Sequence, residues 1–190
     1  MIKNVCVFAS SSNKLDECFY SDAKRLGCLL GLSDMNIVYG GSRLGMMYAC
    51  ASSVKLHGGK IFAVMPERLY ELGVGNPEDC EEFIITTGMR ERKAKMDEMS
   101  DAVIALAGGF GTLEEISEMI VQKQLGYNRK TIIILNTDGF YNSLINFFDN
   151  IIQRNFAKDG ELYYIAKNPE DAINYLKSYN PNTIHLAGKY

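Results

Sequence analysis

A glycine-rich loop at residues 107–112 (Ala-Gly-Gly-Phe-Gly-Thr) has the clearest chemical potential in this chain, because it joins a predicted buried strand to a predicted amphipathic helix. Its glycines, Gly108, Gly109 and Gly111, can present bare backbone N–H groups at the start of that helix. The helix dipole favours an anion at the same end, and phosphate is the expected ligand. The loop lacks the lysine of a P-loop, so a monophosphate suits it better than a triphosphate held with magnesium.

Two glutamates, Glu114 and Glu115, follow this loop in the first part of the expected helix. Together with Thr112 they form a capping box, in which Glu115 reaches back to a cap amide. That structural role alone accounts for Glu115, and the local pattern favours it. A carboxylate beside a bound phosphate also needs a compensating cation or sugar hydroxyls, so a chemical role stays open.

Residues 88–99 supply a cation on a predicted helix. Met89 and Met96 are seven positions apart and share one helix face, and Arg92 falls on that face between them. A cation on an apolar face needs a partner, because an unpaired buried charge is expensive. Arg92, with Lys93 beside it, therefore either pairs with a structural carboxylate or lines a binding site, and we favour the binding site.

Two weaker candidates follow the first two predicted strands. The hydroxyls of Ser11 and Ser12 can donate hydrogen bonds to a phosphate, although a helix cap and turn explains them equally well. Gly40 and Gly41 let the backbone approach a ligand closely, with a tight turn as the alternative. Their spacing is not G-x-G-x-x-G, and no acidic residue follows about 20 positions later, which disfavours NAD binding.

The elements that must position these segments alternate along the chain. Apolar, often β-branched runs predict strands at residues 5–8, 36–39, 60–65, 83–85, 102–106, 131–135 and 163–165. Helical spacing predicts helices at about 14–31, 44–57, 89–99, 112–125, 140–152 and 169–178. The strands are continuous apolar runs, which is typical of a parallel sheet covered on both faces. We therefore predict a doubly wound α/β fold with a parallel sheet of about six to seven strands, helices on both faces and ligands at the carboxyl ends of the strands.

Residues 1–180 form one predicted domain, since no repeat, low-complexity segment or linker interrupts them, and residues 181–190 form a C-terminal tail. Residues 66–81 contain glycines and prolines and predict a long loop, a lid over the site. The sequence starts directly with a strand pattern and lacks the profile of a signal peptide.

Composition and cysteine spacing exclude several classes of function. Twenty basic residues against 23 acidic ones give a net charge of −3, which argues against a nucleic-acid partner. No apolar run approaches the ~20 residues of a membrane span. The five cysteines are widely spaced and the two histidines lie far apart, so we expect no metal site. Scattered cysteines without a secretion signal predict reduced, mostly buried thiols in a cytoplasmic protein.

These segments together resemble the LOG family, the cytokinin riboside 5'-monophosphate phosphoribohydrolases, many of whose members carry the older label "possible lysine decarboxylase". The family pattern P-G-G-x-G-T-x-E-E is similar to residues 107–115, and M-x-x-R-K matches residues 89–93. The patterns Y-G-G-G-x-x-G-L-M and C-V-F-C-G-S-S resemble residues 39–47 and 6–12. The resemblance covers about residues 4–156, and the order and spacing of its motifs are highly specific.

The resemblance implies a Rossmann-like homodimer without a cofactor that hydrolyses the N-glycosidic bond of an AMP-like nucleotide to free base and ribose 5-phosphate. The nucleotide is an N6-substituted AMP or AMP itself, and the implied catalytic pair is Arg92 and Glu115. The implied phosphate site consists of Gly108, Gly109, Gly111 and Thr112. The other residues that we expect at the substrate are Ser11, Ser12, Gly40, Gly41, Met89, Lys93 and Glu114.

The sequence departs from the family pattern at Ala107, Ser42 and Ser10, where the family has Pro, Gly and Gly, and these changes concern substrate choice more than reaction class. The main rival hypothesis is a non-catalytic nucleotide-binding or sensor protein that keeps the same pocket. We reject a lysine decarboxylase, because no lysine here has a recognisable pyridoxal-phosphate context.

Overall fold

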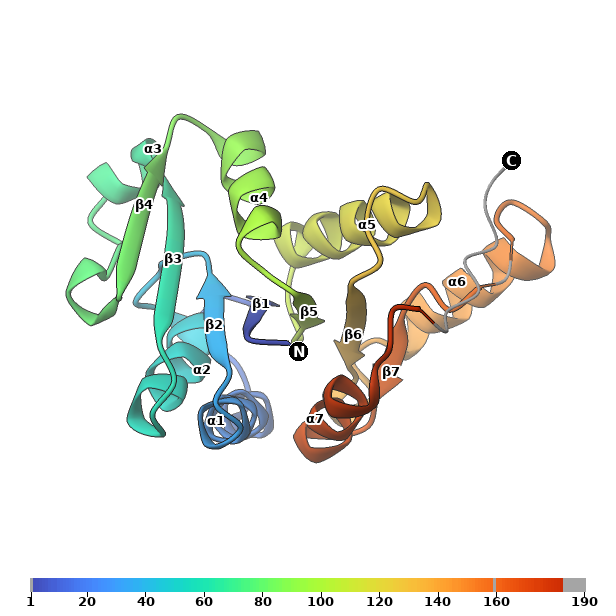
Figure 1. The fold of residues 1–190 in the computed structure, drawn as a ribbon, viewed down its shortest axis with the longest axis horizontal. Helices are drawn as coiled ribbons and strands as arrows, with labels where there is room; N and C mark the ends of the chain where they lie inside the picture. Colours follow the sequence, from blue (N-terminus) through green and yellow to red (C-terminus); the bar gives the residue numbers. More distant parts are fainter. Residues whose placement is uncertain (1, 159, 183–190) are drawn as a thin grey trace.

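One sheet of seven parallel strands organises the chain (Figure 1). The computed structural model describes residues 2–158 and 160–182. The strands lie in the order β4-β3-β2-β1-β5-β6-β7. Their bounds are β1 Asn4–Phe8, β2 Asn36–Tyr39, β3 Ile61–Pro66, β4 Glu82–Thr86, β5 Ala102–Ala105, β6 Thr131–Leu135 and β7 Tyr164–Ala166. The predicted doubly wound α/β fold is confirmed.

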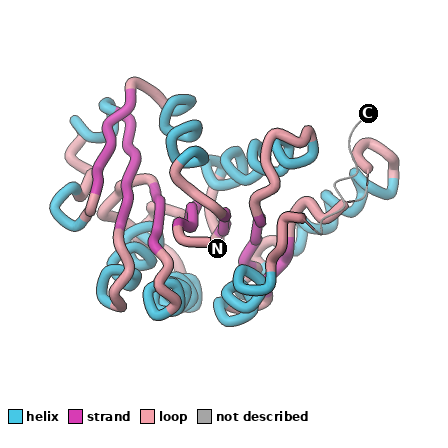
Figure 2. The backbone as a smooth tube through the Cα atoms, in the orientation of Figure 1, coloured by secondary structure: helices cyan, strands magenta, loops and turns pink. Residues whose placement is uncertain are grey.

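Helices cover both faces of this sheet, and Figure 2 shows how strands and helices alternate along the chain. On one face lie α1 (Glu17–Leu32), α2 (Gly45–Leu56) and α7 (Pro169–Ser178). On the other lie α4 (Met89–Glu98), α5 (Phe110–Gln124) and α6 (Asn142–Gln153). Short helices in the connections are α3 (Glu67–Glu71) and the 3₁₀ turns η1 (Pro77–Asp79) and η2 (Thr137–Gly139).

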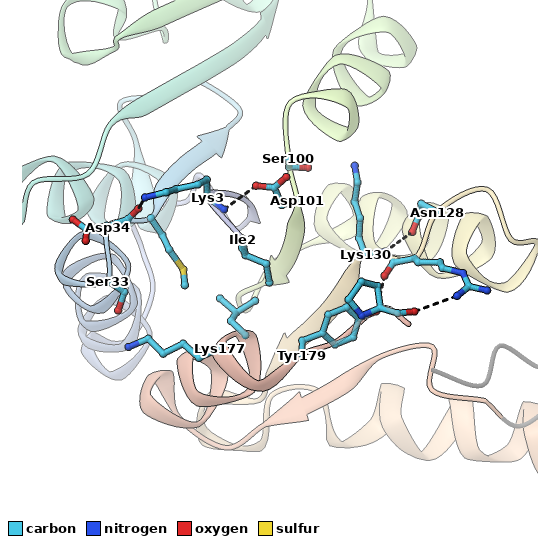
Figure 3. Close-up of a pocket in the computed structure, with 14 residues that line it drawn as sticks. Ile2, Lys3, Ser33, Asp34, Ser100, Asp101, Asn128, Lys130, Lys177 and Tyr179 are labelled. Atoms are coloured by element: carbon cyan, nitrogen blue, oxygen red, sulfur yellow. Dashed lines mark hydrogen bonds between the residues drawn. The ribbon is translucent and has the colours of Figure 1, made fainter. Parts of the chain in front are cut away.

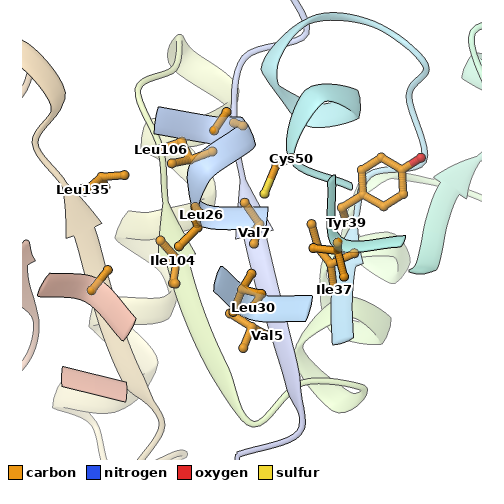
Figure 4. Packing of buried hydrophobic residues seen from close by; sticks show 14 of the residues in the cluster. Val5, Val7, Leu26, Leu30, Ile37, Tyr39, Cys50, Ile104, Leu106 and Leu135 are labelled. Carbon is orange, nitrogen blue, oxygen red and sulfur yellow. The ribbon is translucent and has the colours of Figure 1, made fainter. Parts of the chain in front are cut away.

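The core consists of two apolar layers, one on each face of the sheet, because successive side chains of a strand point to opposite faces. In β1, Val5 and Val7 pack under α1 and α2, whereas Cys6 and Phe8 pack under α4, α5 and α6. Figure 4 shows the first of these layers, in which Leu26 of α1 lies against the sheet. Both layers are apolar, so the strands are continuous hydrophobic runs, as a sheet buried on both faces requires.

The order of the strands creates a switch point at β1. This strand pairs with β2 on one side and with β5 on the other, and the connections that follow β1 and β5 run to opposite faces of the sheet. In open α/β sheets, ligands bind in the crevice outside the carboxyl ends of the strands at such a point. The loops after β1, β2 and β5, which hold the predicted motifs, meet at this edge.

The connection from β3 to β4, residues 66–81, is not the open loop that the sequence predicts. It contains α3 and η1, and its backbone is bonded to the loop after β2. Arg43 N–H donates to the carbonyl of Val74 at 3.0 Å, and Asn76 N–H donates to the carbonyl of Gly41 at 3.1 Å. Residues 66–81 therefore form a wall that is bonded to the loop after β2. Helix α1 also begins at Glu17 rather than at residue 14.

The expectation of mostly buried cysteines is wrong. Only Cys6 and Cys50 are buried, whereas Cys18 is exposed and Cys28 and Cys80 are partly exposed. Cys18 lies in the first turn of α1 and is exposed to solvent. Among the described residues, no helix has the length and apolarity to cross a bilayer. Most of the predicted tail, residues 183–190, lies outside the described residues.

Candidate active site

A cavity of about 420 Å³ opens at the carboxyl ends of β1, β2, β3 and β5. Every loop that the sequence analysis singled out contributes to its lining. The predicted site residues in that lining are Ser11, Gly40, Met89, Arg92, Gly109, Gly111, Thr112 and Glu115. The fold therefore brings these predicted residues from four separate segments of the chain to one place.

An ion pair between Arg92 and Glu115 lies in this cavity. Nη1 of Arg92 donates to Oε1 of Glu115 at 2.6 Å, and Nε of Arg92 donates to the carbonyl of Val64 at 3.2 Å. The two side chains are only 7% and 9% exposed, so the pair is nearly withdrawn from water. The bond to the β3 carbonyl fixes the plane of the guanidinium, which in turn fixes the direction of the carboxylate.

The carboxyl of Glu115 is electrostatically unusual. Burial raises the pKa of Glu115 above its ordinary value, and the charge and hydrogen bond of Arg92 oppose that rise. A buried carboxylate of raised pKa is a better proton acceptor than an exposed one. Pairs of this kind in a cleft mark candidate sites of chemistry.

Gly40 shapes the site through its missing side chain. A Cβ at this position would overlap Nη2 of Arg92 and the terminal methyl of Met47. A side chain at residue 40 would therefore require the ends of Arg92 and Met47 to move, and glycine lets the loop after β2 approach the guanidinium without that movement.

The start of α5 provides unbonded amides. The helix begins at Phe110, its N-cap is Gly109, and no side-chain cap forms there within the described part of the chain. The capping box that the sequence favours is thus wrong: Thr112 lies inside the first turn, and Glu115 binds Arg92 instead of reaching back to an amide. The first N–H groups of the helix are left for a ligand, at the positive end of the helix dipole.

The serines that follow β1 have two different roles. Ser10 and Ser11 line the cavity. Ser12 does not, and its hydroxyl accepts a hydrogen bond from Lys14 N–H at 3.2 Å, which is the alternative role of a turn. The Ser10 N–H donates to the carbonyl of Ala107 at 3.3 Å, so this segment also supports the glycine loop.

Four further predicted residues lie outside the lining of this cavity. Lys93 binds Glu114 and Glu118 and thereby ties α4 to α5 on the outer side of both helices. Its ammonium is already paired, so the cation that lines the cavity is Arg92. Gly41 and Gly108 lie beside the lining, and Gly108 lines a smaller neighbouring cavity between Phe19 and Phe140.

The apolar end of the cavity was not predicted from the sequence. Met47, Met65, Leu69 and Val74 form it, from α2, β3 and the wall that follows β3. No local spacing signals these residues, because each belongs to an ordinary apolar pattern of its own element. Ser42, noted only as a departure from the family pattern, also lines the cavity and is nearly buried.

A larger cavity, about 660 Å³, lies at the opposite edge of the sheet (Figure 3). It is lined by the amino ends of strands, where ligands of open α/β sheets do not bind. Two of its charged side chains are bonded within the fold: Nζ of Lys3 donates to the carbonyl of Asp34 at 3.2 Å, and the carboxylate of Asp101 accepts the Lys3 N–H at 2.8 Å. It gathers no catalytic set, so the cavity at Glu115 is the candidate active site.

Comparison with known proteins finds relatives of this chain in sequence and in fold. A family model described as "Possible lysine decarboxylase" matches residues 47–176. The chain is 37% identical over 181 residues to the cytokinin riboside 5'-monophosphate phosphoribohydrolase LOG5 of Arabidopsis thaliana, covering 94% of this chain and 79% of that protein. It is 35% identical over 189 residues to the probable phosphoribohydrolase LOGL2 of Oryza sativa subsp. japonica, covering 98% and 77%. The Moco carrier protein from Chlamydomonas reinhardtii shares the fold, with a TM-score of 0.70, 20% identity and coverage of 93% and 96%.

Proposed function

Because this chain belongs to the LOG family of cytokinin riboside 5'-monophosphate phosphoribohydrolases, we propose that it hydrolyses the N-glycosidic bond of a purine nucleoside 5'-monophosphate. The products are free base and ribose 5-phosphate. The substrate is an N6-substituted AMP, such as a cytokinin riboside monophosphate, or AMP itself. The observation that carries the proposal is the buried Arg92–Glu115 pair beside the uncapped start of α5.

The nucleotide phosphate belongs at the start of α5. The N–H groups of its first turn and the hydroxyl of Thr112 supply donors, and the helix dipole attracts the negative charge. Glu115 lies about one helical turn further along α5, and we place the ribose of the bound nucleotide beside it. Anchoring the phosphate thus holds C1' against the carboxylate, which is catalysis by positioning.

Glu115 acts on the sugar as the C1'–N9 bond breaks. The bond's electron pair leaves with the purine, and positive charge develops on the ribose, which a carboxylate stabilises. A water molecule adds to C1', Glu115 accepts its proton, and the purine takes a proton from solvent. Arg92 stays charged throughout and holds Glu115 in place, because a guanidinium is a poor proton donor.

The cavity does not suit pyridoxal-phosphate chemistry. Among the described residues, its lining contains no lysine that could form a Schiff base. Lys93 lies close in sequence to Arg92, but its ammonium is held by two glutamates. The name of the matching family model is therefore no guide to the reaction of this chain.

Removal of the 5'-phosphate tests the substrate class. We expect AMP and its N6-isopentenyl derivative to release free base, and adenosine to be at least about 100-fold poorer in kcat/KM, because it lacks a group bonded by charge-assisted hydrogen bonds. Chromatographic assay of the released base measures both. Tight binding of AMP without release of adenine would instead establish the non-catalytic sensor.

The homodimer is a second part of the proposal, and α6 supports it. This helix has apolar residues along one face, yet none of its side chains is buried, and Phe147 is 60% exposed. An apolar groove of about 280 Å³ separates α6 from α5, where Val121 is also exposed. Exposed apolar patches of this kind mark interfaces between proteins. A second copy of the chain is the occupant that the family resemblance favours.

Phe147→Asp is expected to dissociate this dimer. An interface that closes on Phe147 would have to bury an unpaired carboxylate, which raises the dimer dissociation constant by at least about 100-fold. Light scattering coupled to gel filtration measures the mass of each species. Asn146→Asp is the matched control, since this substitution adds the same charge at an exposed position of α6. Equal dimerisation of both variants and the parent chain would place the interface elsewhere.

A further inference from the structure

The apolar end of the active-site cavity is made by the wall that follows β3. Leu69 and Val74 of residues 66–81 line the cavity, whereas the start of α5 lines its other end. Arg92 and Glu115 lie between these two ends, because Arg92 bonds to β3 and Glu115 belongs to α5. If the phosphate occupies the α5 end, as the proposed function requires, the base extends toward the wall.

Backbone contacts hold the outer part of this wall against the loop after β2. Ser42 and Gly75 form an isolated antiparallel bridge, and the Asn76 N–H donates to the carbonyl of Gly41 at 3.1 Å. Ser42 itself lines the cavity, so the bridge joins the wall to the part of the loop after β2 that lines the cavity. The bridge is short, and by itself it does not determine where residues 66–81 lie relative to α2.

Asp79 connects the same wall to α2. Its carboxylate accepts hydrogen bonds from the Tyr48 hydroxyl at 2.9 Å, from Nζ of Lys55 at 2.8 Å and from Nδ2 of Asn76 at 2.6 Å. Tyr48 and Lys55 belong to α2, which is packed on the core, whereas Asn76 and Asp79 belong to the wall. One carboxylate therefore joins a rigid helix to the segment that carries Val74.

These contacts persist across the range of pH in which an enzyme is assayed. Hydrogen bonds from Lys55, Asn76 and Tyr48 lower the pKa of Asp79 to about 2. The carboxylate is thus ionised throughout, and the three donors keep their acceptor. Asp79 lies outside the lining of the cavity, so it touches neither the substrate nor the catalytic pair.

We infer that Asp79 is a positioning residue that holds the Leu69–Val74 wall against the base of the nucleotide, and so determines affinity for the base without acting on the reacting bond. The inference rests on the proposed function for the orientation of the nucleotide. Release of Asp79 should loosen the base end of the cavity. The phosphate end and the Arg92–Glu115 pair should stay as they are, because neither bonds to residues 66–81.

Asp79→Ala tests this division. We expect the KM for AMP to rise about tenfold, kcat to change less than about twofold, and inhibition by ribose 5-phosphate, which lacks a base, to stay unchanged. Asp79→Asn keeps an acceptor oxygen and should restore part of the affinity, and Tyr48→Phe should cause a smaller loss. Glu78→Ala is the matched control, because it removes a neighbouring exposed carboxylate that makes none of these contacts.

Amide hydrogen exchange checks the anchoring without any ligand. The N–H groups of Arg43 and Asn76, which form the bonds between the wall and the loop after β2, should exchange faster in Asp79→Ala than in Glu78→Ala. Unchanged exchange, or equal weakening of AMP and ribose 5-phosphate, would overturn the inference. Failure of the parent protein to release base from any nucleoside monophosphate would refute the proposed function instead, while the exchange result would still decide whether Asp79 anchors the wall.

Discussion

Glu115→Gln is expected to lower kcat for release of adenine from AMP by about 10²–10⁴-fold, with the protein still folded. Glutamine keeps the shape of the side chain and can still accept a hydrogen bond from Arg92, but it cannot take a proton from water or offset positive charge on the ribose. The buried guanidinium loses its counter-charge, which costs about 3–5 kcal/mol of stability. That loss is smaller than the ~5–15 kcal/mol that folded domains usually have.

The neighbouring glutamate supplies the control for this variant. Glu114 is on the same helix and pairs with Lys93, but it does not line the cavity. Glu114→Gln should therefore keep kcat within about threefold, since changes at exposed groups outside a site have small effects. Stopped assays of released adenine, together with thermal unfolding of both variants, separate loss of chemistry from loss of fold. Full activity of Glu115→Gln would remove Glu115 from the mechanism.

The fold was predictable because its signals are local. Each strand is a short apolar run with β-branched residues, and each long helix has a repeated apolar face. The predicted and observed strands agree within about two residues at each end, which is the usual uncertainty of element boundaries. The failure at residues 66–81 has a physical reason: glycine and proline indicate turns there, but the bonds that fix the segment come from α2 and from the loop after β2.

The candidate site was predictable only in part, for a related reason. Helical spacing put Arg92 on an apolar face, and the need of a buried charge for a partner left two alternatives, a structural carboxylate and a binding site, of which the binding site was favoured. Local spacing could not show that both hold, because the contact of Arg92 with Glu115 depends on how α4 lies against α5. The local pattern also favoured a capping role for Glu115, whereas Glu115 accepts a hydrogen bond from Arg92 and the start of α5 has no side-chain cap. Contacts between elements, such as Lys93 with Glu118, leave no trace in local spacing.

Arg92→Met is expected to shift the acid side of the pH–rate profile to higher pH as well as to lower kcat/KM. Arg92 opposes the rise that burial causes in the pKa of Glu115, so its removal raises that pKa further. If the reaction needs ionised Glu115, activity is lost on acidification through a higher pH than in the parent protein. Arg90→Met, on an exposed position of the same helix, should leave the profile unchanged. Identical acid limbs in Arg92→Met and the parent would contradict this coupling.

The pH dependence of the free energy of unfolding checks the raised pKa of Glu115 in Arg92→Met independently of activity. In Arg92→Met the folded pKa of Glu115 lies above the unfolded one, so the folded state binds the proton more tightly. The stability that proton binding by Glu115 contributes is fully present below the unfolded pKa of Glu115 and is lost as pH rises through its folded pKa. Denaturant unfolding should show a deficit of about 3–5 kcal/mol near neutral pH, where the buried carboxylate is unpaired, and a smaller one at acid pH. The double variant Arg92→Met with Glu115→Gln has no buried charge left, so it should recover stability without recovering activity.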